Sequence, residues 1–447
     1  MKRWVVVASI TLGMLLAALD QMIMSTAMPE VQKILGDNME LYSWVFSAYM
    51  LSSTITVPIF GKLADRFGRK NVYLVALGLF LIGSALCALS TSMWQLVLFR
   101  VIQGLGAGGV LPLTVTIAGD LYDLKNRGKI QGLFSSMWAI AGIAGPVLGG
   151  WIIENLHWSW IFWLNLPVGI IAILGFLTFK DQGEVEKTTI DYEGAILLSI
   201  AIGTLLFATL GETWWEIVGL VIISAILFVL FVNHQRTKTH PLIRIEMFQN
   251  PLILWLNISG MIVTMGLFVV PFFIPLFAQE ILGFTPLASG LILMGQVLGW
   301  NIGSVPAGKF ILKLGYKRVI VTGILLLIVG GILLAALVPM LNYTFLLIIM
   351  FILGLGFGIS VTAFTIGVQE AVEYKERGIS TSIQLFSRNI GTTIGVAIVG
   401  GILNLAQGSI TLIQSFQVVF IVSLLITSIS LWTTSKIPVG DHLKKSS

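Results

Sequence analysis

Charged side chains are scarce in this chain of 447 residues. Asp, Glu, Lys and Arg together make up 11% of the sequence, whereas hydrophobic residues make up 56%. A water-soluble fold of this composition would have far too few polar side chains to cover its surface, so that class is excluded. The sequence therefore predicts an integral membrane protein.

Residues that bind metals or form disulfides are also few. The single cysteine, Cys87, can form no intrachain disulfide. All four histidines fall in predicted loops or in the tail, and no cluster has the spacing of metal ligands. The motif GxxxxGK followed by Ser or Thr, which ATP-driven pumps use, is missing from the sequence. We therefore expect a protein that is not an enzyme and that uses neither a cofactor nor a metal.

Long apolar runs are what the sequence has in abundance. A helix needs roughly 20 mainly apolar residues to cross a hydrocarbon core of about 30 Å. Apolar runs bounded by polar residues, Gly or Pro predict fourteen spans, at 4–28, 42–61, 71–90, 94–116, 130–152, 158–178, 193–210, 214–233, 252–279, 287–310, 318–338, 343–367, 380–404 and 414–433. The expected fold class is an all-α membrane protein.

The distribution of basic residues predicts the orientation. With the amino terminus in the cytoplasm, the basic loops and the tail lie inside, Lys33 is the only external basic residue, and Arg100 and Arg388 fall within spans. This pattern obeys the positive-inside rule and predicts a multi-pass protein of the inner (cytoplasmic) membrane with both termini in the cytoplasm. The start of the chain also fits a signal peptide, but its removal would delete a span and invert the charge pattern.

Two segments of the sequence recur in order. GKLADRFGRK at 61–70 returns as GKFILKLGYK at 308–317, and the alternate glycines at 104–108 return at 354–358. Such matches indicate an internal repeat, and parallel six-helix halves with a substrate site between them at midplane are a known transporter architecture. We predict four segments: a six-helix bundle at 1–180, an inserted two-helix hairpin with cytoplasmic linkers at 181–250, a second bundle at 251–435 and a cytoplasmic tail at 436–447.

The loop between the second and third spans combines an acid, several bases and two glycines. Its distinctive residues are Gly61, Asp65, Arg66, Gly68 and Arg69. Glycine permits a tight turn, and opposite charges close together suit a cytoplasmic gate that opens repeatedly. An ordinary positive-inside loop is the alternative explanation.

This loop resembles the loop signature of the major facilitator superfamily. Residues 19–29 resemble the first-helix motif of its fourteen-helix drug:proton antiporters, although Met22 and Ser25 stand where Thr and Asn are usual. The stretch at 158–169 is also similar, with Ser159 in place of the usual Arg. Within that family, length and pattern are most similar to those of staphylococcal multidrug exporters.

Two more motifs carry the resemblance. The fourth-helix motif matches at Arg100, Gln103 and Gly104, and the fifth-helix antiporter motif matches at Gly142, Gly145, Pro146, Gly149 and Gly150. In the family the fifth-helix motif is linked to antiport. Without the family resemblance, the glycines indicate only close packing between helices at small residues.

The resemblance implies two six-helix bundles that work by alternating access and export hydrophobic or cationic drugs and dyes in exchange for protons. The expected partners are the lipid bilayer, protons and such small molecules, with no nucleic acid, and a monomer is expected to be the working form. A dedicated exporter of an endogenous lipid, siderophore or metabolite, or a proton-coupled importer, stays open as an alternative. A channel or a membrane enzyme is a more distant one.

Asp20 is the only acidic residue well inside a predicted span. An ionised Asp there costs about 2.5–3.5 kcal/mol on insertion scales, so it should be protonatable or paired. At about 1.5 Å per residue, Asp20 and Arg100 lie roughly 12 and 9 Å from the outer ends of their spans. We predict that they couple transport to protons, with Asp20 alternating between a protonated state and a deprotonated state bound to Arg100 or substrate. A static structural pair is the alternative.

Several spans supply side chains that could line a substrate cavity. Methionine and aromatic side chains adapt to flat cations, and Gln296 is polar at depth. The candidates are Asp20, Met24, Tyr49, Phe272, Phe273, Gln296, Trp300 and Phe364. For each taken singly, core packing or lipid contact is an equally good explanation. Arg388 could snorkel to the inner surface and Glu280 lies near an outer end, so a role of either in coupling stays open.

Overall fold

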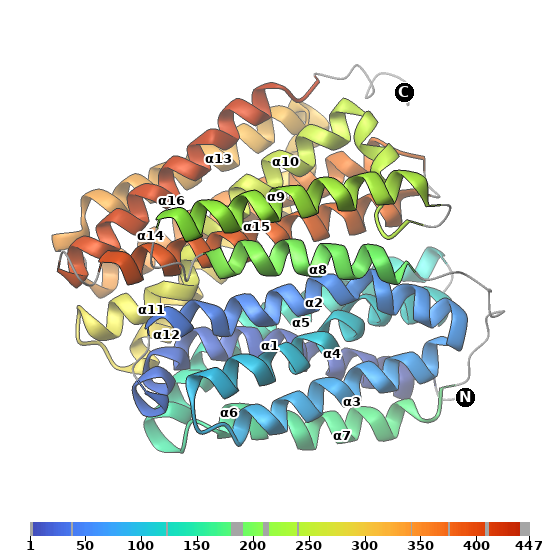
Figure 1. Ribbon diagram of the computed structural model, residues 1–447, viewed down its shortest axis with the longest axis horizontal. Helices are drawn as coiled ribbons and strands as arrows, with labels where there is room; N and C mark the ends of the chain where they lie inside the picture. Colours follow the sequence, from blue (N-terminus) through green and yellow to red (C-terminus); the bar gives the residue numbers. More distant parts are fainter. Residues whose placement is uncertain are drawn as a thin grey trace. The chain divides into compact units, whose positions relative to one another are not determined.

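The computed structural model describes residues 3–36, 39–121, 124–179, 191–208, 214–238, 241–340, 342–373, 376–406 and 411–438. Helices are the only regular secondary structure in these residues (Figure 1). The chain divides into two compact units. The first comprises Met1–Ile243 and Thr285–Leu287, and the second comprises Arg244–Phe284 and Ala288–Ser447.

The first unit contains nine α-helices among its described residues. They are α1 (Arg3–Leu35), α2 (Met39–Phe67), α3 (Arg69–Ala88), α4 (Met93–Leu121), α5 (Leu124–Asn155), α6 (Trp160–Trp163), α7 (Asn165–Phe176), α8 (Tyr192–Phe207) and α9 (Trp214–Thr237).

The remaining helices belong to the second unit, apart from the first two residues of α12. They are η2 (Ile245–Gln249), α10 (Pro251–Met265), η3 (Leu267–Val269), α11 (Val270–Glu280), α12 (Pro286–Leu314), α13 (Tyr316–Ala336), η4 (Val338–Met340), α14 (Tyr343–Glu370), α15 (Arg377–Ala406) and α16 (Leu412–Ser435).

Every predicted span coincides with a described helix or with consecutive helices. Among the described residues, ten helices are long and apolar enough to cross a membrane, or eleven if the bent pair Pro251–Met265 and Leu267–Glu280 counts as one span. Trp160–Phe176 and Tyr192–Leu205 are apolar but shorter. The expected all-α membrane fold is therefore confirmed.

The span predicted at 252–279 is broken, with a bend of 43° between its two parts. The break falls at Gly266, which packs against Thr427 of α16. There the hydroxyl of Thr427 accepts a hydrogen bond from the backbone N–H of Leu267 at 2.9 Å. Because a side chain satisfies the backbone group that the bend frees, the break is tolerated inside an apolar bundle.

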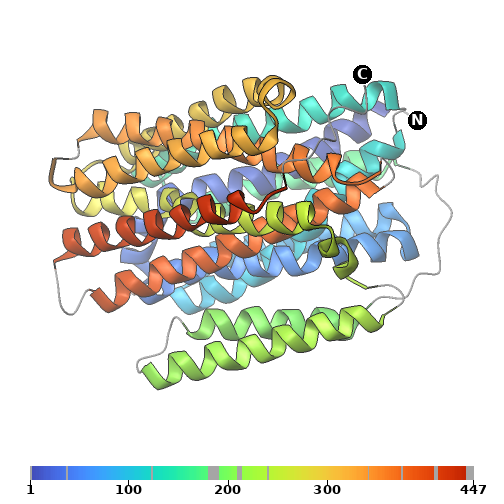
Figure 2. The ribbon, with the colours of Figure 1, turned by 90° about the horizontal axis from the view of Figure 1, so that it is seen from above.

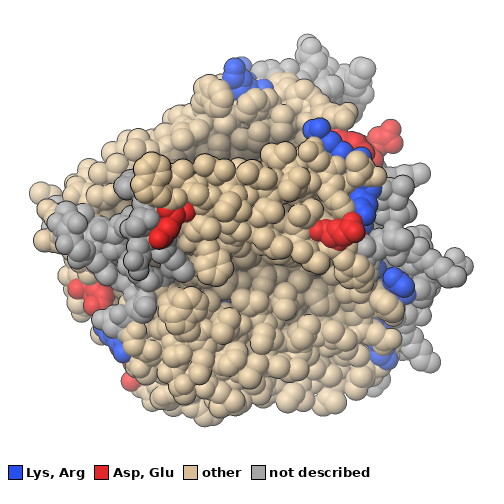
Figure 3. Space-filling view, viewed as in Figure 1, with Lys and Arg blue, Asp and Glu red and all other residues tan. Residues whose placement is uncertain are grey.

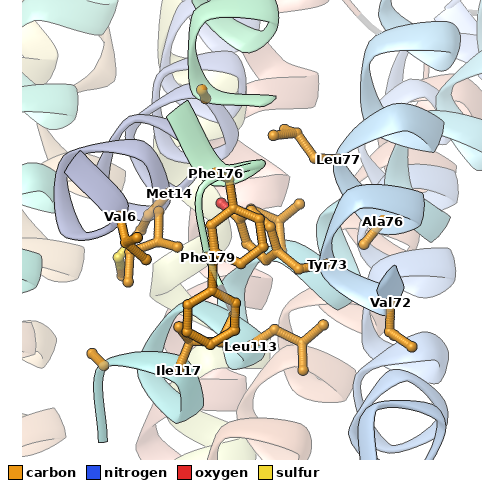
Figure 4. Packing of buried hydrophobic residues seen from close by; sticks show 14 of the residues in the cluster. Val6, Met14, Val72, Tyr73, Ala76, Leu77, Leu113, Ile117, Phe176 and Phe179 are labelled. Atoms are coloured by element: carbon orange, nitrogen blue, oxygen red, sulfur yellow. The ribbon is translucent and has the colours of Figure 1, made fainter. Parts of the chain in front are cut away.

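A cluster of buried apolar side chains holds the first unit together (Figure 4). The ring of Tyr73 from α3 lies 4.4 Å from that of Phe176 from α7, which in turn stacks on Phe179 at 5.1 Å. Val6 of α1 and Leu113 of α4 belong to the same cluster. Packing of this kind fixes α1 and α4 relative to each other, and these two helices carry the central polar residues described below.

Helices α8 and α9 lie side by side as a hairpin (Figure 2). Asp191, directly before α8, accepts hydrogen bonds from the Gly194 backbone at 3.0 Å and from Gln235 at 2.6 Å, and it pairs with His234 at 2.8 Å. Burial raises the pKa of the Asp191 carboxyl, but these hydrogen bonds together outweigh burial and hold the pKa below its ordinary value. The carboxylate therefore ties the start of α8 to the end of α9.

Uncharged side chains cover most of the face drawn in Figure 3, and few charged side chains interrupt them. Along α9, Ile222, Ile226 and Val229 are each more than half exposed, at 53%, 54% and 57%. Apolar side chains exposed along a whole helix suit contact with lipid rather than with water.

We expect Asp191→Ala to lower the Tm of the purified protein by about 2 °C or more, because loss of a helix N-cap alone costs about 1 kcal/mol. The matched control is Glu193→Ala, which removes an exposed carboxylate that pairs with Lys238 and, at 3.7 Å, with His234, and it should leave the Tm nearly unchanged. Since the folded pKa of Asp191 is depressed, the stabilisation is present above the ordinary pKa of about 3.9 and is lost as the pH falls through the lower folded value. Equal Tm values for both variants at neutral pH would contradict this role.

Candidate functional site: a buried carboxylate network

Four polar side chains meet in the interior of the first unit. Asp20 of α1 forms an ion pair with Arg100 of α4, and both side chains are at most 1% exposed. The Oδ1 atom of Asp20 also accepts hydrogen bonds from Gln103 at 2.8 Å and from Asn165 at 3.3 Å. The structure thus brings together the two residues that the sequence placed at similar depth.

The Arg100 side chain is buried, and its guanidinium has partners besides Asp20. It donates to Gln103 Oε1 at 2.8 Å and to the backbone oxygen of Val45 at 3.5 Å. Its carbon lies 4.1 Å from the centre of the Tyr49 ring, a cation–π contact. Each charge of the pair is therefore compensated by its partner and by further hydrogen bonds, as a buried ion pair requires.

Glycines let the neighbouring helices approach α4 closely. Gly104 of α4 lies against the backbone of Tyr49 in α2, and Gly83 of α3 lies against the backbone of Gln103. Thr56 of α2 donates to the backbone oxygen of Leu105 at 3.2 Å. Small residues at such crossings allow close contact between helices. Here the close contact between α2 and α4 places the Tyr49 ring against the Arg100 guanidinium.

The antiporter-motif glycines of α5 pack on α1 next to the carboxylate. Gly145 lies against Met22 and Ile23, and a Cβ on Gly149 would lie 2.8 Å from the backbone oxygen of Ile23. These contacts are within about one turn of Asp20 along α1. Gly142, Pro146 and Gly150 lie on the same helix.

The predicted gate motif surrounds a turn that needs glycine. Gly68, between α2 and α3, has a φ of 85°, and Gly315, its counterpart in the repeat, has a φ of 78° before α13. Gly61 lies in α2, and Arg66 stacks 5.2 Å from the centre of the Phe67 ring. The side chain of Asp65 is outside the described residues.

The repeat also places matching lysines at matching helix ends. Lys70 donates to the backbone oxygen of Leu177 at 2.5 Å, just after α7. Lys317 donates to the backbone oxygens of Ser435 at 2.7 Å and Ile437 at 2.9 Å, at the end of α16. Both lysines therefore cap carbonyls at a helix C-terminus, where a positive charge is favourable. Arg69, next to Lys70 in α3, belongs to the same predicted motif.

The cavity candidates fall in both units. Asp20, Met24 and Tyr49 lie in the first, and Phe272, Phe273, Gln296, Trp300 and Phe364 lie in the second. In the second unit the Trp300 ring lies 5.7 Å from that of Phe268, which is 5.1 Å from Phe357. Phe273 and Phe364 are almost fully buried, which is compatible with the core-packing alternative.

Sequence reasoning did not single out Asn165. Its amide bridges the Asp20 carboxylate and the Ser84 hydroxyl, the latter at 2.9 Å, and it begins α7. The available signal was an amide residue within the apolar stretch Trp160–Phe176. A polar side chain at that depth needs partners, which here are Asp20 and Ser84.

A bundle of apolar spans around a buried acid and its basic partner is an arrangement that membrane transporters use. Residues 10–396 and 256–446 match the sequence profile of the Major Facilitator Superfamily, and the chain belongs to that family.

Curated relatives and solved structures agree with this assignment. The chain is 34% identical over 417 residues to "Multidrug transporter protein MdtP" of Bacillus subtilis, with 92% of this chain and 77% of the relative covered. It is 34% identical over 402 residues to "Multidrug resistance protein 3" of the same organism, with 88% and 78% covered. A crystal structure of a D-xylose-proton symporter has the same fold, with a TM-score of 0.74 at 14% identity and 99% of each chain covered.

We expect Gly149→Ala to lower the Tm and the transport rate, because the added Cβ would force α5 away from α1. Gly78→Ala is the matched control, since no atom lies within 4 Å of the Cβ it would add. Alanine is intrinsically about 1 kcal/mol better than glycine in a helix, so the control should keep or raise the Tm. A Gly149→Ala protein with the stability and the transport rate of the control would contradict the close contact.

Proposed function

We propose that this protein is a proton-coupled multidrug exporter of the fourteen-helix drug:proton antiporter family, with Asp20 as its main protonation site. The observation that carries the proposal is the fully buried Asp20 carboxylate, held by Arg100, Gln103 and Asn165. Ionisable groups inside membrane spans are usually functional. The names of the two Bacillus relatives support drugs as substrates.

In this proposal a proton and a cationic substrate compete for one carboxylate. Protonation of an Asp20 oxygen removes its negative charge and weakens the ion pair with Arg100. Deprotonation restores a carboxylate that can bind either Arg100 or a substrate cation. Because the two ligands exclude each other, proton entry from outside drives release, and substrate capture from the cytoplasm or the inner leaflet drives proton loss inward.

Tyr49 gives the substrate a second contact. The Arg100 guanidinium now occupies the face of the Tyr49 ring at 4.1 Å. When Arg100 moves away from Asp20, that face is open to another cation, such as the charged end of a drug. In the absence of substrate, Arg100 thus occupies the position that the substrate cation would take. Met24, buried one turn from Asp20, supplies an adaptable apolar contact.

Alternating access couples export of the substrate to the inward flow of protons. Moving one elementary charge across 100 mV is worth about 2.3 kcal/mol. Exchange of a monovalent cation for one proton moves no net charge, so the pH gradient alone would drive it. We further propose a monomer in the cytoplasmic membrane, with both termini in the cytoplasm and with two six-helix bundles at 1–180 and 251–435 that flank an inserted hairpin.

The test is dye uptake into inside-out vesicles with an acidic lumen, with wild type, Asp20→Asn and a control across a panel of monovalent cations. Glu30→Gln is the control, because Glu30 is a partly exposed acid of the same helix that pairs with Lys33. We expect gradient-driven transport in wild type and Glu30→Gln and its loss in Asp20→Asn. An Asp20→Asn protein as active as wild type would place coupling elsewhere.

Substrate breadth separates the alternatives. Wild-type vesicles that move a single compound class would favour a dedicated exporter of an endogenous lipid, siderophore or metabolite. Uptake in the opposite sense, with proton and substrate moving together, would favour an importer. Transport of several unrelated dyes is the result that the multidrug proposal requires.

A further inference from the structure

The second unit has its own group of buried polar side chains, where α10 packs on α15. The Thr264 hydroxyl of α10 donates to the backbone oxygen of Arg388 in α15 at 2.9 Å, and Gly391 lies against the backbone of Met261. A Cβ on Gly260 would lie 3.5 Å from Gln384 Nε2 and 3.8 Å from Arg388 Cγ. Gln384 and Arg388, one turn apart on α15, therefore share the surface that faces α10.

Two of these side chains have polar atoms without a hydrogen-bond partner among the described residues. Gln384 is 1% exposed, and its Nε2 is unpartnered, as is the buried Nε of Arg388. More than nine-tenths of buried polar groups in proteins are paired, so two orphans one turn apart on the same face of α15 point to a ligand.

Arg388 contrasts with Arg100. Among the described residues no carboxylate lies within ion-pair distance of Arg388, whereas Arg100 has Asp20. A cationic side chain inside an apolar span is costly and by default functional. Arg388 as a whole residue is intermediate in exposure, and its Nε is buried.

The donor set selects the ligand. A guanidinium presents a planar fork of N–H donors that matches the two oxygens of a carboxylate, and the amide of Gln384 adds further donors one turn away. The Cδ2 atom of Phe364 lies 3.7 Å from the same Cβ position on Gly260, so an aromatic ring adjoins the donors. Glycine at 260 leaves the space between these groups free of a side chain.

We propose that Arg388 and Gln384 bind the carboxylate of a transported substrate, with Phe364 against its apolar part. This inference rests on the proposed export function and extends it. Arg388 then gives the second unit a basic site for acids, independent of Asp20 in the first unit. Aromatic carboxylic acids therefore belong to the substrate range beside simple cations.

The test is equilibrium binding of two dyes to the purified full-length protein in detergent, with no gradient present. One dye is a rhodamine with a free carboxyl group, and the other is the methyl ester of the same dye. We expect Arg388→Gln to weaken binding of the acid dye roughly tenfold or more, the loss expected for a hydrogen bond between charged groups, and to leave the ester within about twofold. Gln384→Met keeps the side-chain volume and should weaken only the acid dye, by a smaller factor.

Leu385→Ala is the matched control, because Leu385 lies on α15 between these residues and is 45% exposed. It should bind both dyes as wild type does. Equal losses for acid and ester in Arg388→Gln and Gln384→Met would overturn the proposal and leave Arg388 a structural residue. If the Arg388 variant does not accumulate, the Gln384 variant decides alone.

An inorganic anion is the competing occupant. If added chloride displaces the acid dye from wild type and raises the Tm of wild type but not of Arg388→Gln, the site binds chloride and the carboxylate proposal is wrong. Vesicle export of the ester dye by wild type keeps the two claims apart. Its absence would count against the export function, whereas the binding comparison would still decide the carboxylate site.

Discussion

The buried ion pair between Asp20 and Arg100 is the interaction on which the first unit depends. Removing one partner of such a pair costs about 3–5 kcal/mol, because the other charge is left unpaired. The surrounding helices are arranged to satisfy it: Gln103 and Asn165 complete the carboxylate, and Tyr49 covers the guanidinium. A compensated pair is stable, yet one proton is enough to unbalance it. That combination suits a coupling site better than a purely structural one.

Much of this arrangement could be predicted from the sequence, because apolar periodicity locates helices and helix rise gives depth. Asp20 and Arg100 were the buried charges at similar depth in the first half, so the sequence made their contact possible, and the packing of α1 against α4 brings them together. Asn165 could not be foreseen in the same way, since its role depends on how α7 crosses α1 and α3. The break at Gly266 depends on Thr427, far along the chain, which local patterns do not reveal.

The substrate-cavity residues were the hardest to choose from the sequence. Every span is apolar, so a lining Phe and a packed Phe have the same local pattern. Phe268 and Phe357, which surround Trp300, were not distinguished from their neighbours for that reason. Arg388 and Arg100 likewise share a residue type and a membrane setting. Only the structure separates them, because one has its carboxylate and the other has orphaned donors beside it.

The most direct test of the central claim is whether substrate binding expels a proton from Asp20. Purified protein in weakly buffered detergent at neutral pH is mixed with a permanently charged cationic dye, and bound dye and released protons are measured together. The account predicts proton release with each dye bound by wild type and none from Asp20→Asn that still binds dye. Equal proton release from both proteins, or dye binding to wild type without any release, would contradict it.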